Sequence, residues 1–175
     1  MTAFNHEQQG KNFVIVKSAK DTRDNKVKSR ALKMEMDCIP IVHFSDLLQI
    51  AMKQKPDWLF VDEAQFLTAD MVDTLGLLVD DFNIQVICYG LLTDFQSKLF
   101  EGSLRLMESA DNRHEIINQC IYCENKANRN MRVVQDVPIF EGESIQPGGN
   151  EMYMSVCRKC YNARKRNSEG KVGGY

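Results

Sequence analysis

The sequence predicts an α/β fold, with a parallel sheet flanked by helices and a smaller cysteine-rich unit towards the C-terminus. Two observations predict it. Short apolar runs alternate with segments of helical period up to about residue 117, and their short connections favour right-handed crossovers between parallel strands. The later segments are short, extended and punctuated by cysteine, glycine and proline. We therefore expect an α/β domain over residues 1–117, a second domain over 118–164 and a disordered tail over 165–175.

The first expected strand is the β-branched run at residues 13–16, and it leads into a polar turn at 17–24. Ser45 is expected to cap the first helix, because a serine hydroxyl can accept a hydrogen bond from a free amide of the first turn. The apolar members of that helix include Leu47, Leu48 and Met52. Pro56 then introduces a strand at Trp58–Val61.

Thr68 is expected to start a second helix, because apolar residues follow it at helical rather than strand spacing. These residues are Met71, Leu75, Leu78, Val79 and Phe82. A second buried strand is expected over residues 84–89, followed by a loop over 90–98 and a third helix from about Phe100 to Ser109.

Composition limits the class of protein. The chain has 175 residues, 43% of them hydrophobic, and a formal charge of -2, which suits one ordinary core with a small appendage. The charge does not favour nucleic-acid binding, which depends largely on clustered positive charge. No apolar stretch approaches the roughly 20 residues that cross a bilayer, and residues 1–9 are polar. We expect a cytoplasmic protein without membrane or nucleic-acid partners.

Asp62 and Glu63 directly follow the apolar run Trp58–Val61. Strands buried on both faces are continuously apolar, and open α/β sheets bind ligands beyond the carboxyl ends of their strands. The aspartate could hold a metal ion on nucleotide phosphates, and the glutamate could take a proton from a hydroxyl group. The alternative for an isolated Asp-Glu pair is a solvated acidic turn.

Two C-x-x-C pairs provide the strongest spacing signal in the chain, and they contain four of its six cysteines. Two such pairs supply the four sulfurs of a closed tetrahedral zinc site, so we expect structural zinc on Cys120, Cys123, Cys157 and Cys160. Redox dithiols and inert buried thiols are the alternatives. Cys38 and Cys88 lie in apolar segments and are interpreted as small buried hydrophobic residues.

The segment between the two cysteine pairs is expected to form a long loop, of the kind that often serves as a lid or binding loop. Tyr153, just before the second pair, could contact a ligand or simply pack. Gly148 and Gly149 could approach a ligand closely or only form a tight turn.

Three groups of residues resemble the type II thymidine kinase family. They are Val61-Asp62-Glu63-Ala64-Gln65-Phe66-Leu67, the segment from Cys88-Tyr89-Gly90-Leu91 through Phe95 to Phe100, and the segment from Gly148-Gly149 through Tyr153 to Cys160. Their order and spacing match as well, from about Glu7 to Lys165. The resemblance implies a sheet of the P-loop or RecA-like type and a zinc ribbon carrying a lasso loop.

The resemblance also implies an activity: transfer of the terminal phosphoryl group of ATP, with Mg²⁺, to the 5′-hydroxyl of thymidine in nucleoside salvage. Glu63 matches the general base of the family and Asp62 its magnesium-side carboxylate. Asp21 and Arg23 match a loop near the reacting phosphate and hydroxyl. The matching nucleoside-binding positions are Phe66, Leu91, Phe95, Phe100, Gly148, Gly149 and the lasso residue Tyr153. The family further implies a homotetramer and feedback inhibition by thymidine triphosphate, dTTP.

The sequence departs from the family at one motif. These kinases begin with a strand and a phosphate loop of the form G-x-x-x-x-G-K-[ST], and the 175 residues contain no such motif. We therefore expect the α/β domain to be N-terminally incomplete and this chain to be inactive alone. A non-catalytic nucleoside-binding remnant is the alternative, and a zinc-ribbon nucleic-acid module is a third that the acidic balance disfavours.

Overall fold

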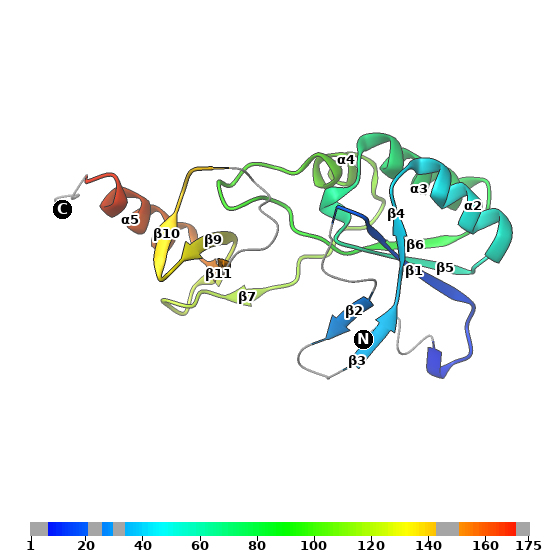
Figure 1. Cartoon of the computed structure of the whole chain (residues 1–175), viewed down its shortest axis with the longest axis horizontal. Helices are drawn as coiled ribbons and strands as arrows, with labels where there is room; N and C mark the ends of the chain where they lie inside the picture. The colour runs from blue at the N-terminus through cyan, green and yellow to red at the C-terminus, as the bar shows by residue number, and fades with distance from the viewer. Residues whose placement is uncertain (1–6, 21–25, 30–33, 143–150, 171–175) are drawn as a thin grey trace. The chain divides into compact units, whose positions relative to one another are not determined.

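The computed structural model describes residues 7–20, 26–29, 34–142 and 151–170. The chain forms two compact units. The first comprises the chain up to Leu92 together with Phe100–Asp111, and the second comprises Thr93–Leu99 together with the chain from Asn112 onward. In the first unit the helices flank a parallel sheet (Figure 1), which confirms the predicted α/β class.

The sheet of the first unit has the strand order β4-β1-β5-β6, with every neighbouring pair parallel. The strands are β1 (Phe13–Ser18), β4 (Ile39–Ile41), β5 (Trp58–Asp62) and β6 (Gln85–Cys88). β1 and β5 are central, and their apolar residues after Phe13 and Trp58 are buried. The continuous apolar runs in the sequence therefore correctly marked the two interior strands.

The two edge strands differ from the sequence prediction. β4 was not predicted, because it has only three residues and one of them is Pro40; proline is tolerated at a sheet edge, where its missing N–H leaves no ladder bond unmade. Residues 84–89 were predicted to form a buried strand, but β6 is shorter and only half-buried. It pairs with β5 alone among the described strands, so one side of it is open.

Helix α2 (Phe44–Gln54) begins earlier than the sequence predicted. Its N-cap is His43, so Ser45 lies within the first turn and is not the cap. The side chain of Asp46 reaches back instead, and its Oδ2 atom accepts hydrogen bonds from the backbone N–H groups of Val42 (2.8 Å) and His43 (2.9 Å). These bonds fix the start of the helix and satisfy amide groups there.

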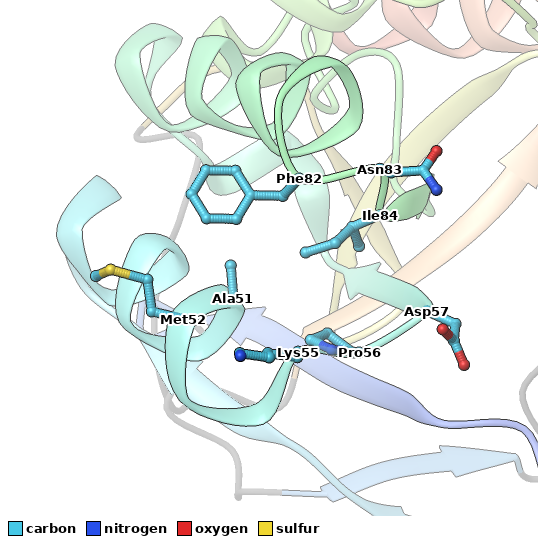
Figure 2. A pocket seen from close by; sticks show the side chains of 8 residues that line it. All are labelled: Ala51, Met52, Lys55, Pro56, Asp57, Phe82, Asn83 and Ile84. Carbon is cyan, nitrogen blue, oxygen red and sulfur yellow. The ribbon is translucent and has the colours of Figure 1, made fainter.

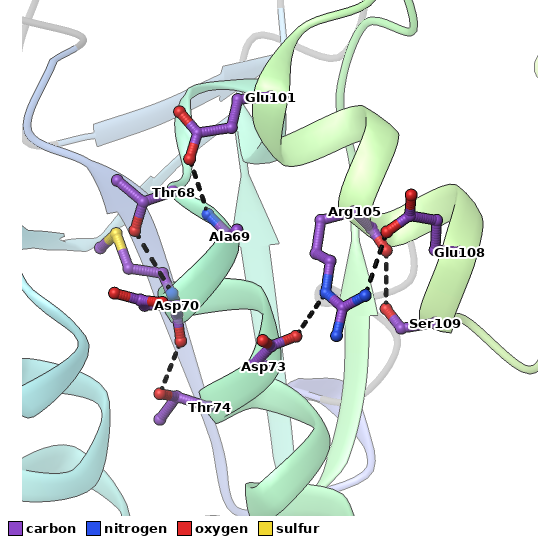
Figure 3. Close-up of polar contacts among 10 residues, drawn as sticks. Thr68, Ala69, Asp70, Asp73, Thr74, Glu101, Arg105, Glu108 and Ser109 are labelled. Atoms are coloured by element: carbon purple, nitrogen blue, oxygen red, sulfur yellow. Dashed lines mark hydrogen bonds and ion pairs between the residues drawn. The ribbon is translucent and has the colours of Figure 1, made fainter.

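Helix α3 (Ala69–Asp80) is capped as predicted, because Thr68 Oγ1 accepts a hydrogen bond of 3.3 Å from Met71 N. Helix α4 (Glu101–Ser109) is tied to α3 by polar contacts along its length (Figure 3). Glu101 Oε1 accepts from Ala69 N at 3.0 Å, and Arg105 Nε lies 2.6 Å from an oxygen of Asp73. These contacts hold α4 beside α3.

A large apolar core joins the sheet to the helices, and several of its members are completely buried. Among them are Val16, Ile41, Leu47, Val61 and Leu78. A smaller cluster of Ile15, Cys38 and Phe60 forms a separate core. The buried position of Cys38 agrees with its interpretation as a small hydrophobic residue. An antiparallel hairpin of β2 (Lys26–Ser29) and β3 (Met34–Asp37) was not predicted from the sequence.

The second unit contains a three-stranded antiparallel sheet in the order β10-β9-β11. Its elements are β7 (Asn118–Gln119), β8 (Lys126–Ala127), β9 (Arg129–Val134), β10 (Val137–Ile139), β11 (Glu151–Val156) and α5 (Arg158–Ser168). Met131 and Val156 are completely buried in its core. Residues 165–168, which the sequence assigned to a disordered tail, continue α5. Cys157 caps that helix by accepting from Cys160 N at 3.4 Å. Within the described part of the chain, no helix has the length and apolar character needed to span a membrane.

Candidate functional site

Asp62 and Glu63 lie where the sequence predicted them, at the carboxyl end of the central strand β5. Asp62 is the last residue of β5 and Glu63 directly follows it, and both are half-buried. The neighbouring strands β1 and β6 run parallel to β5, so their carboxyl ends meet at the same edge of the sheet. This is the edge at which open α/β sheets bind ligands.

Glu63 has a left-handed backbone conformation, with φ of 50° and ψ of 39°. That conformation costs a residue with a side chain about 1–2 kcal/mol, and it is often found at functional sites. A short 3₁₀ turn, η1 (Ala64–Phe66), follows directly. Gln65 belongs to this turn, and its Nε2 atom donates a 2.6 Å hydrogen bond to Glu63 Oε2. The carboxylate is therefore held by a side chain two residues away.

Lys17 is a candidate site residue that the sequence did not predict. It was assigned to a polar turn, but it is the penultimate residue of β1, with 2% of its surface exposed. Lys17 pairs in register with Asp62, and paired residues of neighbouring strands point to the same face of a sheet. A lysine is rarely fully buried unless it is paired. Only the strand register could have indicated it.

Three of the predicted nucleoside-contacting residues belong to the first unit. Phe66 and Phe100 form an edge-to-face pair with ring centroids 5.7 Å apart. Leu91, in the loop after β6, is 46% exposed, so its side chain is available to a ligand. The backbone of Leu91 is fixed, because its N–H donates to Gln65 Oε1 at 3.1 Å and its carbonyl accepts from Ser103 Oγ at 2.6 Å.

Two further predicted contacts, Phe95 and Tyr153, belong to the second unit. Phe95 is 1% exposed, and the guanidinium of Arg132 lies 5.2 Å from the centre of its ring. The Phe95 carbonyl accepts a 2.7 Å hydrogen bond from the hydroxyl of Tyr161, and burial raises the pKa of that tyrosine. Tyr153 lies on β11 and is 49% exposed. Asp21, Arg23, Gly148 and Gly149 lie outside the described residues.

The four cysteines of the two C-x-x-C pairs come together in the second unit. Their sulfur atoms all lie within 4.8 Å of one another. Cys123 Sγ is 3.6 Å from Cys157 Sγ and 3.7 Å from Cys160 Sγ. A tetrahedral zinc ion with Zn–S bonds of about 2.3 Å would separate its sulfurs by about 3.8 Å. The cluster therefore fits a metal ion of this kind, as the sequence spacing predicted.

The thiol pKa values in this cluster are displaced in opposite directions. Burial acts to raise the pKa of Cys120, but hydrogen bonds with Cys157, Tyr122 and Cys123 together outweigh it and lower the pKa to about 6. Burial and the neighbouring sulfur of Cys157 raise the pKa of Cys160 to about 12. Thiolate character at Cys120 suits a metal ligand. By contrast, desolvation raises the pKa of the isolated Cys88 thiol to about 12, as expected for an inert residue.

A separate pocket lies at the opposite edge of the sheet, and it contains none of the predicted site residues. It is bounded by the end of α2 and by the residues that precede β5 and β6 (Figure 2). Met52, Lys55, Asp57 and Phe82 are among its lining residues. Because Asp57 and Ile84 precede their strands, this pocket is at the amino ends of β5 and β6, away from Glu63.

Comparisons with known proteins assign the family. The family model described as thymidine kinase matches residues 2–161. A thymidine kinase of Streptococcus pyogenes serotype M3 is 43% identical over 162 residues, which cover 91% of this chain and 86% of the relative. A thymidine kinase of Streptococcus agalactiae serotype Ia has the same identity and coverage. The chain therefore belongs to the thymidine kinase family.

Proposed function

We propose that this protein transfers the γ-phosphoryl group of ATP to the 5′-hydroxyl of thymidine, a reaction of pyrimidine nucleoside salvage. One observation carries the proposal: in a chain of the thymidine kinase family, the Asp62–Glu63 pair lies at the carboxyl end of the central strand β5. The strained backbone of Glu63 and its bond from Gln65 support a functional role for that carboxylate.

Glu63 is proposed as the general base. Its carboxylate takes the proton of the 5′-hydroxyl while the nucleoside oxygen bonds to the γ-phosphorus, and the bond from that phosphorus to the bridging oxygen breaks to release ADP. Asp62 is proposed to hold Mg²⁺, which would neutralise charge on the phosphates when bound. Asp21 and Arg23 are proposed to lie near the reacting groups, where a guanidinium stabilises charge that develops on the phosphoryl oxygens.

The nucleoside is proposed to contact aromatic and apolar side chains, because a pyrimidine ring favours flat apolar walls. The proposed contacts are Phe66, Leu91, Phe95, Phe100, Gly148, Gly149 and Tyr153. The edge-to-face pair of Phe66 and Phe100 and the exposed side chain of Leu91 support this assignment in the first unit.

The four-cysteine cluster is proposed to hold structural zinc, supported by sulfur separations of 3.6 and 3.7 Å. Family resemblance is the basis for three further proposals. These are a cytoplasmic location, assembly as a homotetramer and feedback inhibition by dTTP.

Phosphate binding is the part of the reaction for which these 175 residues contain no recognised motif. A phosphate loop cradles the β- and γ-phosphates with backbone N–H groups and a lysine, and the 175 residues contain no G-x-x-x-x-G-K-[ST] sequence. We therefore propose that the transfer reaction requires a phosphate-loop segment in addition to these 175 residues, which alone bind thymidine but do not phosphorylate it. The same observation favours a second candidate function, that of a non-catalytic nucleoside-binding protein.

The test compares two purified chains, the 175 residues alone and the same residues preceded by a phosphate-loop segment from a family member. Each is incubated with ATP, Mg²⁺ and thymidine, deoxycytidine or deoxyadenosine, and nucleoside monophosphate is measured. The proposal is supported if the extended chain phosphorylates thymidine and the 175-residue chain does not. Thymidine binding by calorimetry without phosphorylation by either chain would instead support the second candidate, and absence of thymidine binding would contradict both.

A further inference from the structure

Gln65 is a buried polar residue whose side chain is bonded at both ends. Only 2% of its surface is exposed. Its Nε2 atom donates to Glu63 Oε2 at 2.6 Å, and its Oε1 atom accepts from Leu91 N at 3.1 Å. Because a carboxylate only accepts and a backbone N–H only donates, these two partners determine the orientation of the amide group.

The direction of the Glu63 carboxylate depends on this hydrogen bond. Its left-handed backbone conformation persists only where the surrounding structure compensates for the strain. A hydrogen bond that involves an ionised carboxylate is about twice as strong as one between neutral groups. The bond from Gln65 therefore favours one direction of the Glu63 carboxylate relative to the sheet edge.

Leu91 is held equally firmly on the other side of Gln65. Its carbonyl accepts from Ser103 Oγ at 2.6 Å, so both backbone groups of Leu91 are bonded to side chains. The preceding residue, Gly90, allows this close approach, because a Cβ atom there would lie 2.7 Å from Gln65 Oε1. Any larger residue at position 90 would displace the amide group of Gln65.

We propose that Gln65 is a positioning residue that couples the carboxylate of Glu63 to the loop backbone at Leu91. One side chain thereby sets the relative position of the proposed general base and a proposed wall of the nucleoside site. This assignment rests on the proposed function. It predicts that a change at either end of the Gln65 side chain alters the other end.

Two substitutions of Gln65 separate its two bonds. Gln65→Glu keeps an oxygen that can accept from Leu91 N but replaces the donor to Glu63 with a second carboxylate. Gln65→Met keeps the length of the side chain and removes both bonds. Gln85→Glu is the matched control, because it makes the same chemical change at an exposed position at the amino end of β6.

Steady-state kinetics are measured in the chain that phosphorylates thymidine. We expect Gln65→Glu to lower kcat by about tenfold or more while the thymidine KM stays within about twofold, because the loop remains bonded. Gln65→Met should lower kcat and also raise KM. Gln85→Glu should match the wild type. If kcat in both Gln65 variants stays within about twofold of the wild type, the assignment is wrong.

Amide hydrogen exchange tests the coupling by a measurement that does not require kinase activity. Glu63→Ala removes the carboxylate that orients Gln65, so exchange at the Leu91 amide should become faster by about tenfold. The Tyr89 amide is the internal reference, because it donates to Val61 O at 2.8 Å independently of Gln65. Unchanged Leu91 exchange in Glu63→Ala, or equal acceleration at Tyr89, would overturn the coupling. Failure of the wild-type chain extended by a phosphate-loop segment to phosphorylate thymidine would contradict the proposed function, and this exchange result would then still test the role of Gln65.

Discussion

Gly102 of α4 lies against the carbonyl oxygen of Ala64, so closely that a Cβ atom on Gly102 would be 2.5 Å from that oxygen. The carbonyl of Leu67 would be 2.8 Å away. Both oxygens belong to backbone carbonyl groups, which cannot rotate away as the end of a side chain can. This contact packs the start of α4 directly onto the turn that follows Glu63.

The first prediction concerns this glycine. Gly102→Ala should lower the free energy of unfolding of the first unit by about 1–3 kcal/mol, because the added methyl group forces the backbone apart. Gly76→Ala in α3 is the matched control, since a Cβ there meets nothing within 4 Å. It should instead raise stability by up to about 1 kcal/mol through helix propensity. The fluorescence of Trp58, the single tryptophan, reports denaturant unfolding of this unit. Equal stability of the two variants would contradict the packing argument.

The second prediction concerns Asp46 and pH. Hydrogen bonds from the backbone of His43 and Val42 lower the pKa of this carboxyl below its usual value of 3.8. A lowered pKa in the folded state contributes stability above the unfolded pKa, and the contribution is lost as pH falls through the folded pKa. Asp46→Asn should therefore lower the free energy of unfolding by about 1 kcal/mol at pH 7.

The pH series provides the check. The difference between Asp46→Asn and the wild type should shrink as the pH is lowered below about 4, because the unfolded carboxyl then takes up a proton, and it should be lost once the pH falls through the lower folded pKa. Asp70→Asn removes an exposed charge in the first turn of α3 and should have a smaller effect at pH 7. A difference that is constant from pH 7 to pH 3 would show that the backbone bonds to Asp46 are not its source.

The parts of the fold that the sequence predicted are those determined locally. The apolar run before Asp62 marked β5, and Thr68 marked the start of α3, because strand burial and helix capping depend on near neighbours. Edge strand β4 and the buried position of Lys17 depend on which strands pair and in what register. The sequence pattern carries no direct signal for that register.

The same distinction applies to the candidate site. Asp62 and Glu63 were predicted from the apolar run that precedes them, and the four cysteines from their spacing along the chain. Gln65 was passed over, because its partner Leu91 lies 26 residues away and the bond forms only once β6 lies beside β5. A buried glutamine can be recognised as functional only when both of its bonds are known.

The third prediction concerns the cysteine cluster. Elemental analysis should find one zinc ion per chain in the wild type, and Cys157→Ser should lose most of it, because a serine hydroxyl is a poor zinc ligand. The second unit should then be cleaved faster in limited proteolysis, since a structural metal supplies folding energy to a small core. Cys88→Ser is the control, because Cys88 lies outside the four-cysteine cluster, and this variant should bind as much zinc as the wild type. Zinc-free wild-type protein with four freely titrating thiols would contradict the assignment.

The most direct test of the proposed reaction is single-turnover transfer of the γ-phosphoryl group from ATP to thymidine, measured in wild type, Glu63→Gln and Glu124→Gln in the chain that carries a phosphate loop. Glu124 is exposed and provides the matched change. If Glu63 is the general base, Glu63→Gln lowers the transfer rate by about 100-fold or more and leaves thymidine affinity within about twofold, while Glu124→Gln behaves as wild type. Transfer by Glu63→Gln at the wild-type rate would contradict the central assignment.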